Sequence, residues 1–222
     1  MEPEYFIRQI IVSAVPILAA IILHEISHGF VAYKLGDPTA KIMGRLTLNP
    51  IAHIDLFGTI LMPLILLIST QGQMVFGYAK PVPINPHNFR DPKRDMAISA
   101  AAGPLMNIFI ALASIIVLKY LILPVASHGS EEMVGRIMKP LVMMLTASVQ
   151  INIVLAAFNL LPIPPLDGGR VLMGLLPDRY AYTVGRIEPF GMIIVLVLVA
   201  TGGAGYIVMP FMRLILNLIS MV

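Results

Sequence analysis

The chain has 222 residues and a formal net charge of +3 at pH 7, and 58% of its residues are apolar while 12% are charged. A soluble domain is typically about 45–50% apolar and about 25% charged, so this composition excludes an ordinary water-soluble domain. The sequence has no cysteine, which excludes disulfides and thiol chemistry. Its basic residues lie in short loops between apolar segments, where they orient a membrane protein and indicate no nucleic-acid partner.

Long uncharged runs recur along the chain and approach or exceed the ~18–20 residues with which a helix crosses a bilayer. They cover residues 10–23, 56–75, 96–118, 141–166 and 191–212. The sequence therefore predicts an all-α polytopic membrane protein with about five to six transmembrane helices. We expect residues 1–222 to form a single domain embedded in the lipid bilayer.

The first predicted helix covers about residues 6–33, and a short apolar segment follows over about 56–70. Beyond it, Pro81, Pro83, Pro86 and Pro92 exclude a regular helix. We therefore expect the region of about 56–94 to be re-entrant and partly extended or β-stranded. It must be buried against protein, because unpaired backbone cannot face lipid. Residues 75–85 are the candidate edge strand, the position in a sheet that tolerates proline.

Two further helices are expected over about 95–123 and 140–161. The second runs into "NLLPIPPLDGGR", where three prolines and two glycines stop the helix. C-terminal helices are expected over about 187–222. Glycines at 202, 203 and 205 interrupt that region, so it forms either one kinked helix or two short ones.

The loops differ in charge, which predicts the orientation of the chain. Lysines and arginines gather in the loops within 34–45, 80–94 and 170–186, whereas the loop at 123–137 carries Glu131 and Glu132. Basic loops stay on the cytoplasmic side. The ends of the first and fourth apolar segments then meet the cytoplasmic leaflet, in what we expect to be the plasma membrane, so their polar residues can share one site.

The end of the first helix reads "HEISH", with His24, Glu25 and His28 in a segment otherwise suited to lipid. Residues i and i+4 lie on one helix face, so the two histidines can hold one metal ion. This is the H-E-x-x-H arrangement of zinc peptidases, in which the glutamate is the general base for a zinc-activated water. Ionisable groups inside a membrane are costly and are functional candidates by default.

Catalytic zinc usually has three protein ligands and one open position. The candidates for the third ligand are acids and histidines near the inner leaflet, namely His53, Asp55, His87, Asp95 and Asp167. Asp167 is favoured because it stands alone at the end of an apolar segment, where the prolines let the chain turn inward. Its alternative role is that of a helix N-cap for the residues from Gly168 onward.

Three stretches together resemble the site-2 protease family of intramembrane zinc metalloproteases: "HEISH", "AAGPLMN" at residues 101–107, and "NLLPIPPLDGGR" at 159–170. The chain resembles compact members, which lack a PDZ insert and regulatory nucleotide-binding modules. The resemblance implies a catalytic core of three helices, here the first, third and fourth segments. It also implies that His24, His28 and Asp167 bind Zn²⁺ and that Glu25 is the general base.

The sequence also predicts which parts of the chain contact the substrate. A protease needs an extended substrate, and an edge strand within residues 75–85 could bind one by backbone hydrogen bonds. A structural hairpin is the alternative. Asn107 and Asn159 are polar residues in apolar runs that could contact a substrate carbonyl or the developing oxyanion. Hydrogen bonding between helices is the alternative role for both.

The sequence thus predicts a zinc endopeptidase that hydrolyses peptide bonds in or near transmembrane segments of a protein or peptide substrate. The alternative is a membrane transporter or channel for metal ions, with a His/Asp transit site. A transporter should show polar residues along a path through the membrane. The outer halves of the first and fourth segments, residues 10–23 and 141–145, are nearly without them, which favours a closed site.

Overall fold

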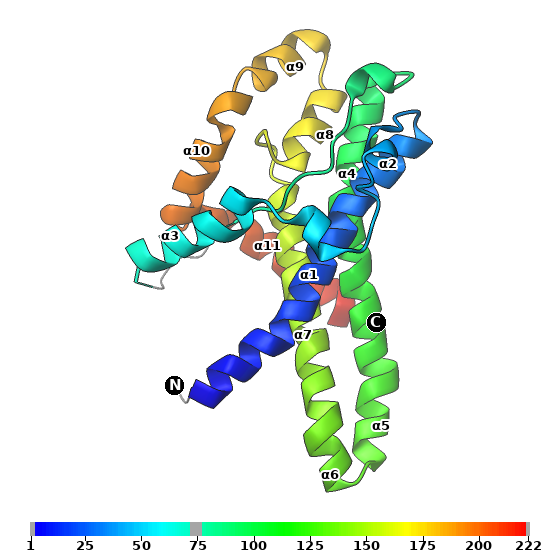
Figure 1. Ribbon diagram of the computed structural model, residues 1–222, viewed down its shortest axis with the longest axis vertical. Helices are drawn as coiled ribbons and strands as arrows, with labels where there is room; N and C mark the ends of the chain where they lie inside the picture. Colours follow the sequence, from blue (N-terminus) through cyan, green and yellow to red (C-terminus); the bar gives the residue numbers. More distant parts are fainter. Residues whose placement is uncertain (1–2, 72–76, 221–222) are drawn as a thin grey trace.

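The computed structural model describes residues 3–71 and 77–220, and within these residues every regular element is a helix. Three long helices form the centre of the molecule (Figure 1). These are α1 (Pro3–Lys34), α4 (Pro92–Val117) and α7 (Lys139–Asn159). They are the counterparts of the helices expected over 6–33, 95–123 and 140–161.

A long hairpin extends from this centre and ends far from the other loops (Figure 1). Its first arm continues α4 through η4 (Leu118–Ile122) and α5 (Leu123–His128). Its second arm passes from α6 (Glu131–Met133) through η5 (Val134–Met138) into α7. By length and composition, 12–34, 92–128 and 131–159 can each cross a membrane.

The central helices are packed through small and polar side chains, while large apolar side chains face outward. On α4 the buried set recurs every three or four residues: Asp95, Ser99, Ala100, Gly103, Pro104, Asn107, Ala111 and Ser114. Its outward face carries Leu105, Phe109 and Ile116, each more than half exposed. This is the pattern of a helix that contacts other helices through small residues and lipid through large ones.

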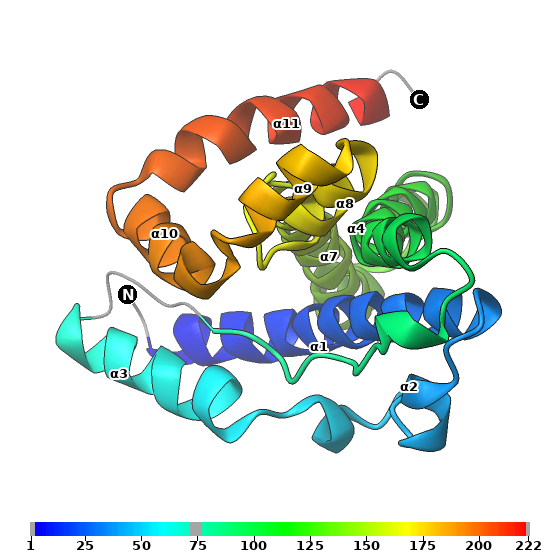
Figure 2. The ribbon, with the colours of Figure 1, turned by 90° about the horizontal axis from the view of Figure 1, so that it is seen from above.

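The region of about 56–94 begins with two apolar helical segments, η2 (Leu56–Leu61) and α3 (Met62–Ser69). After residues 72–76, which lie outside the described part, residues 77–85 run without helical structure along α1 (Figure 2). The start of the candidate edge strand, residues 75 and 76, therefore cannot be compared. The described remainder is not paired in a strand ladder, and proline accounts for part of this, since it donates no hydrogen bond.

Polar side chains fix this extended segment to the loop that follows α1. The buried carboxylate of Asp37 accepts hydrogen bonds from the Asn85 N–H at 2.7 Å and the Asn88 side chain at 2.7 Å. Burial alone would raise the pKa of Asp37, but the hydrogen bonds from Asn88, Thr39 and Asn85 outweigh it and hold the pKa below its ordinary value. The remaining short elements here are α2 (Thr39–Ile42), η1 (Pro50–His53) and η3 (Pro86–Asn88).

The C-terminal quarter contains α8 (Asp167–Leu175), α9 (Asp178–Gly185), α10 (Glu188–Ala200) and α11 (Gly203–Ser220). Of the two forms expected for the C-terminal region, the structure has two helices, which meet at Gly202, whose φ of +72° suits glycine. Met212 of α11 packs against a core cluster of Ala111, Val149 and Ile153 from α4 and α7. Helices α9 and α10 would count as one span only with a bend of 62°, which gives up to four spans among the described residues.

Candidate metal centre

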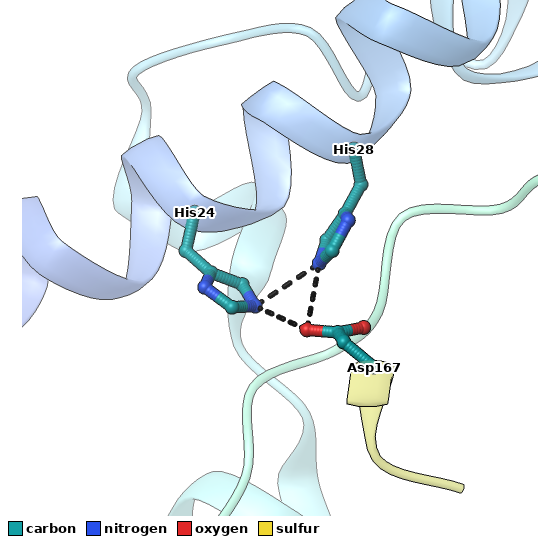
Figure 3. Close-up of side chains that lie close together, drawn as sticks. All are labelled: His24, His28 and Asp167. Carbon is teal, nitrogen blue, oxygen red and sulfur yellow. Dashed lines mark hydrogen bonds and ion pairs between the residues drawn. The ribbon is translucent and has the colours of Figure 1, made fainter. Parts of the chain in front are cut away.

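Three side chains from two distant parts of the sequence meet beside α1 (Figure 3). His24 and His28 come from successive turns of α1, and Asp167 comes from the first position of α8. The Nε2 atoms of His24 and His28 are 3.0 Å apart. Asp167 Oδ2 lies 3.1 Å from Nε2 of His24 and 3.2 Å from Nε2 of His28. All three residues are buried. Among the described residues, this is the one group of histidines and acids that could hold a metal ion.

The outer nitrogens of the two rings determine which atoms face the centre. His28 Nδ1 lies 2.8 Å from the carbonyl oxygen of Ser99, which can only accept a hydrogen bond. His24 Nδ1 lies 2.5 Å from Oδ1 of Asn107. Each Nδ1 is therefore the N–H donor, and each Nε2 directs a lone pair to the centre, the arrangement found in histidine ligands. The Asp167 carboxylate adds a third such atom.

Three converging acceptors require a cation between them. The separations of 3.0–3.2 Å are close to the roughly 3.3 Å edge expected when zinc holds nitrogen and oxygen ligands tetrahedrally at about 2.0–2.1 Å. The residues present therefore fit a zinc ion.

Glycines allow these side chains to approach so closely. A Cβ atom on Gly103 of α4 would collide with His28 Nε2 and lie 2.5 Å from His28 Cε1 and 2.6 Å from His24 Cε1. A Cβ atom on Gly168 would collide with backbone atoms of Leu160 and Leu161, so this glycine lets α8 start against the loop that precedes it. The N-cap of α8 is Leu166, and the Asp167 side chain turns to the histidines instead of capping the helix.

A buried polar network continues from His24 into the bundle. The Asn107 side chain donates to the carbonyl of Ala20 at 3.2 Å and to Oδ1 of Asn152 at 2.8 Å. Asn152 donates to the carbonyl of Ser148 at 2.8 Å, and the hydroxyls of Ser148 and Ser114 are 2.8 Å apart. The network joins α1, α4 and α7, and it occupies both ends of the Asn107 amide within the protein.

Glu25 is half-buried on α1, and its Oε2 accepts a hydrogen bond of 2.8 Å from the peptide N–H of Val82. It is one residue from His24 and therefore beside the group of ligands, not in it. Asn159 ends α7, and its amide donates to the Leu155 carbonyl at 3.0 Å.

The other acids and histidines considered as third ligand lie in different surroundings. His53 is buried and faces the Thr47 carbonyl, and Asp55 caps η2. His87 is exposed in η3, and Asp95 accepts from the Asp91 N–H.

Asn152, Ser99, Gly103 and Val82 are contacts that sequence reasoning missed. Asn152 had a signal, since it is an amide within an apolar helix four residues after Ser148. Val82 acts through its backbone N–H and Gly103 through the absence of a side chain, whereas Ser99 binds His28 through both its carbonyl oxygen and its hydroxyl.

Comparison with known proteins gives a family and several relatives. The model of peptidase family M50 matches residues 12–201. "Putative zinc metalloprotease YwhC" of Bacillus subtilis is 37% identical over 199 residues, which cover 90% of this chain and 84% of that protein. "Zinc metalloprotease MJ0392" of Methanocaldococcus jannaschii is 25% identical over 166 residues, or 75% of this chain and 34% of that protein.

A third relative comes from a mycobacterium. "Putative zinc metalloprotease Rip2" of Mycobacterium tuberculosis is 27% identical over 181 residues, which cover 82% of this chain and 63% of that protein. No solved structure matches the chain.

Proposed function

Because this chain belongs to peptidase family M50, we propose that it is an intramembrane endopeptidase that cleaves peptide bonds in or near transmembrane segments. Family membership and the apolar helices make it a membrane zinc metalloprotease. The substrate and the position of cleavage are the proposed part. The observation that carries the proposal is the convergence of His24, His28 and Asp167 at the end of a membrane-length helix.

In this proposal His24, His28 and Asp167 hold the zinc ion and Glu25 is the general base. A zinc ion held by these residues would make the attacking water more acidic and would polarise the scissile carbonyl. The Glu25 carboxylate takes one proton from the attacking water as the water oxygen bonds to the carbonyl carbon. Glu25 then gives a proton to the amine nitrogen as the C–N bond breaks, and it returns to the carboxylate form.

The finer features of the expected architecture also belong to the proposal. We place the site toward the cytoplasmic leaflet of the plasma membrane, with residues 1–222 as one membrane-embedded peptidase domain. The region 56–94 re-enters the membrane on that side, and its extended part lies where a substrate chain could be held. Asn159 ends α7 near the loop that leads to Asp167, which supports a role with the substrate carbonyl.

A metal-ion transporter is the alternative function, and it needs a polar path across the bilayer. The network from Asn107 to Ser114 does extend into the bundle, but its groups bind one another and it contains no acid or histidine beyond the site itself. That composition suits the fixing of a ligand more than the passage of an ion.

The test is cleavage of a synthetic single-span peptide, with a fluorophore and a quencher on either side of the membrane segment, by the full chain in liposomes. We expect cleavage by the wild type with about one zinc per chain. Glu25→Gln should lose cleavage and keep its zinc, because its ligands are unchanged. If Glu25→Gln cleaved the peptide at the wild-type rate, the proposed mechanism would be wrong. Zinc uptake into liposomes that contain the protein in their membrane and no zinc inside would favour the transporter.

A further inference from the structure

The extended segment that runs beside the metal centre is attached at both ends to parts of the protein other than Glu25. On one side, the Lys80 N–H donates to the His53 carbonyl at 2.9 Å and the Lys80 carbonyl accepts from Arg45 at 2.8 Å. On the other, the Asn85 N–H donates to buried Asp37. The position of the backbone between these points therefore does not depend on Glu25.

Val82 contacts α1 through both its backbone and its side chain. Its side chain is buried against Gly29, where an added Cβ would lie 2.7 Å from Val82 Cγ1. Gly29 is four residues after Glu25, so both are on one face of the helix. The absence of a side chain at Gly29 allows the backbone of Val82 to come within hydrogen-bond distance of the Glu25 carboxylate.

The sequence around Val82 leaves one donor in this place. Pro81 and Pro83 have no N–H, so the Val82 N–H is the one peptide donor of the three residues. In an extended chain alternate N–H groups point to the same side. Those of Tyr78 and Lys80 donate to protein carbonyls at 3.0 and 2.9 Å, and that of Val82 donates to Glu25 Oε2 at 2.8 Å. Among the described residues, no donor reaches Oε1.

We propose that the peptide N–H of Val82 is a positioning group that holds the Glu25 carboxylate by Oε2 and leaves Oε1 directed to the reacting water. The inference rests on the proposed role of Glu25 as general base. A hydrogen bond to a carboxylate is stronger than one between neutral groups, and a backbone donor fixed at both ends loses no freedom when it forms. The Glu25 carboxylate is thereby held in one orientation.

Val82→Pro removes the N–H, and Val82→Ala removes most of the side chain but keeps the N–H, so the pair separates the two contributions. We expect kcat of Val82→Pro for the synthetic peptide to be about 10-fold or more below that of Val82→Ala. The KM and the zinc content should agree within about twofold between the variants, since the Val82 N–H binds Glu25 and is not offered to the substrate, and the metal ligands are unchanged. Equal kcat values, or a higher kcat for Val82→Pro, would overturn the inference.

Amide exchange tests the contact without activity and in a chain that keeps Val82. With ¹⁵N-valine and ¹⁵N-lysine labels, the Val82 amide should exchange at least about 10-fold faster in Glu25→Ala than in the wild type, while the Lys80 amide keeps its rate. Val82→Ala identifies the signal. An unchanged Val82 rate would refute the contact even if Val82→Pro did not fold. A wild type that cleaves no peptide counts instead against the proposed function, and the exchange result still stands.

Discussion

Gly103 is the residue at which one methyl group should disturb the metal centre most. Its Cα faces both histidine rings from α4, and a Cβ atom built there would lie 2.5 Å from His28 Cε1. Ordinary van der Waals contact begins near 3.4 Å, so the ring would have to move by 3.4 − 2.5, or about 0.9 Å. Zinc–ligand distances hold within about 0.2 Å, so a displacement of this size is several times the tolerance of the site.

We therefore expect Gly103→Ala to weaken zinc binding by about 100-fold or more, or about 2.7 kcal/mol. The assay is competition with a chromophoric zinc chelator on the detergent-purified full chain, together with elemental analysis of the metal. Gly135→Ala is the matched control, because a Cβ atom at Gly135 has no neighbour within 4 Å. It should bind zinc as the wild type does. One zinc per chain at wild-type affinity in Gly103→Ala would show that the rings are not held where the structure has them.

Three further variants test the surroundings of the site. Asp167→Ala should lose tightly held zinc without unfolding, which elemental analysis and a thermal melt can check; full zinc occupancy would mean another third ligand. Asn107→Leu should weaken zinc binding about 10–100-fold and lower the free energy of unfolding by about 1–3 kcal/mol, because it leaves His24 Nδ1 and Asn152 Oδ1 without the Asn107 side chain as partner. The lowered pKa of Asp37 means that its carboxylate stabilises the fold at pH 7 and loses this effect as the pH falls below about 4 through the folded-state pKa. The difference in melting temperature between wild type and Asp37→Asn should therefore be large at pH 7 and shrink toward pH 3; a difference independent of pH would contradict this reasoning.

The sequence predicted the parts of the site that depend on spacing and on isolated charge. His24 and His28 are four residues apart on a helix that any apolar run of this length would form, so their common face could be deduced. Asp167 was deduced from its isolation in an apolar stretch. Its freedom to turn inward depends on Gly168 and on the loop at 160–166, which the glycines and prolines only suggested.

Other features depend on tertiary contacts that carry no local pattern. The hydrogen bond from Val82 to Glu25 joins residues 57 positions apart and uses a backbone donor. The identity of the Val82 side chain therefore does not predict this contact. The extended form of residues 77–85 followed from proline, but their partners did not. Their N–H groups donate to the carbonyls of Gly58 and His53 and to the carboxylates of Glu25 and Asp37, and no second strand takes part among the residues described.

The network from His24 to Ser114 links metal chemistry to the assembly of the bundle. Separation of α1, α4 and α7 would leave two buried amides and two hydroxyls without partners in hydrocarbon, which is costly whether or not an ion is present. In a zinc finger the metal drives folding and its removal unfolds the chain. Here the hydrogen bonds between α4 and α7 involve no metal ligand, so we expect the bundle to stay assembled when a chelator removes zinc.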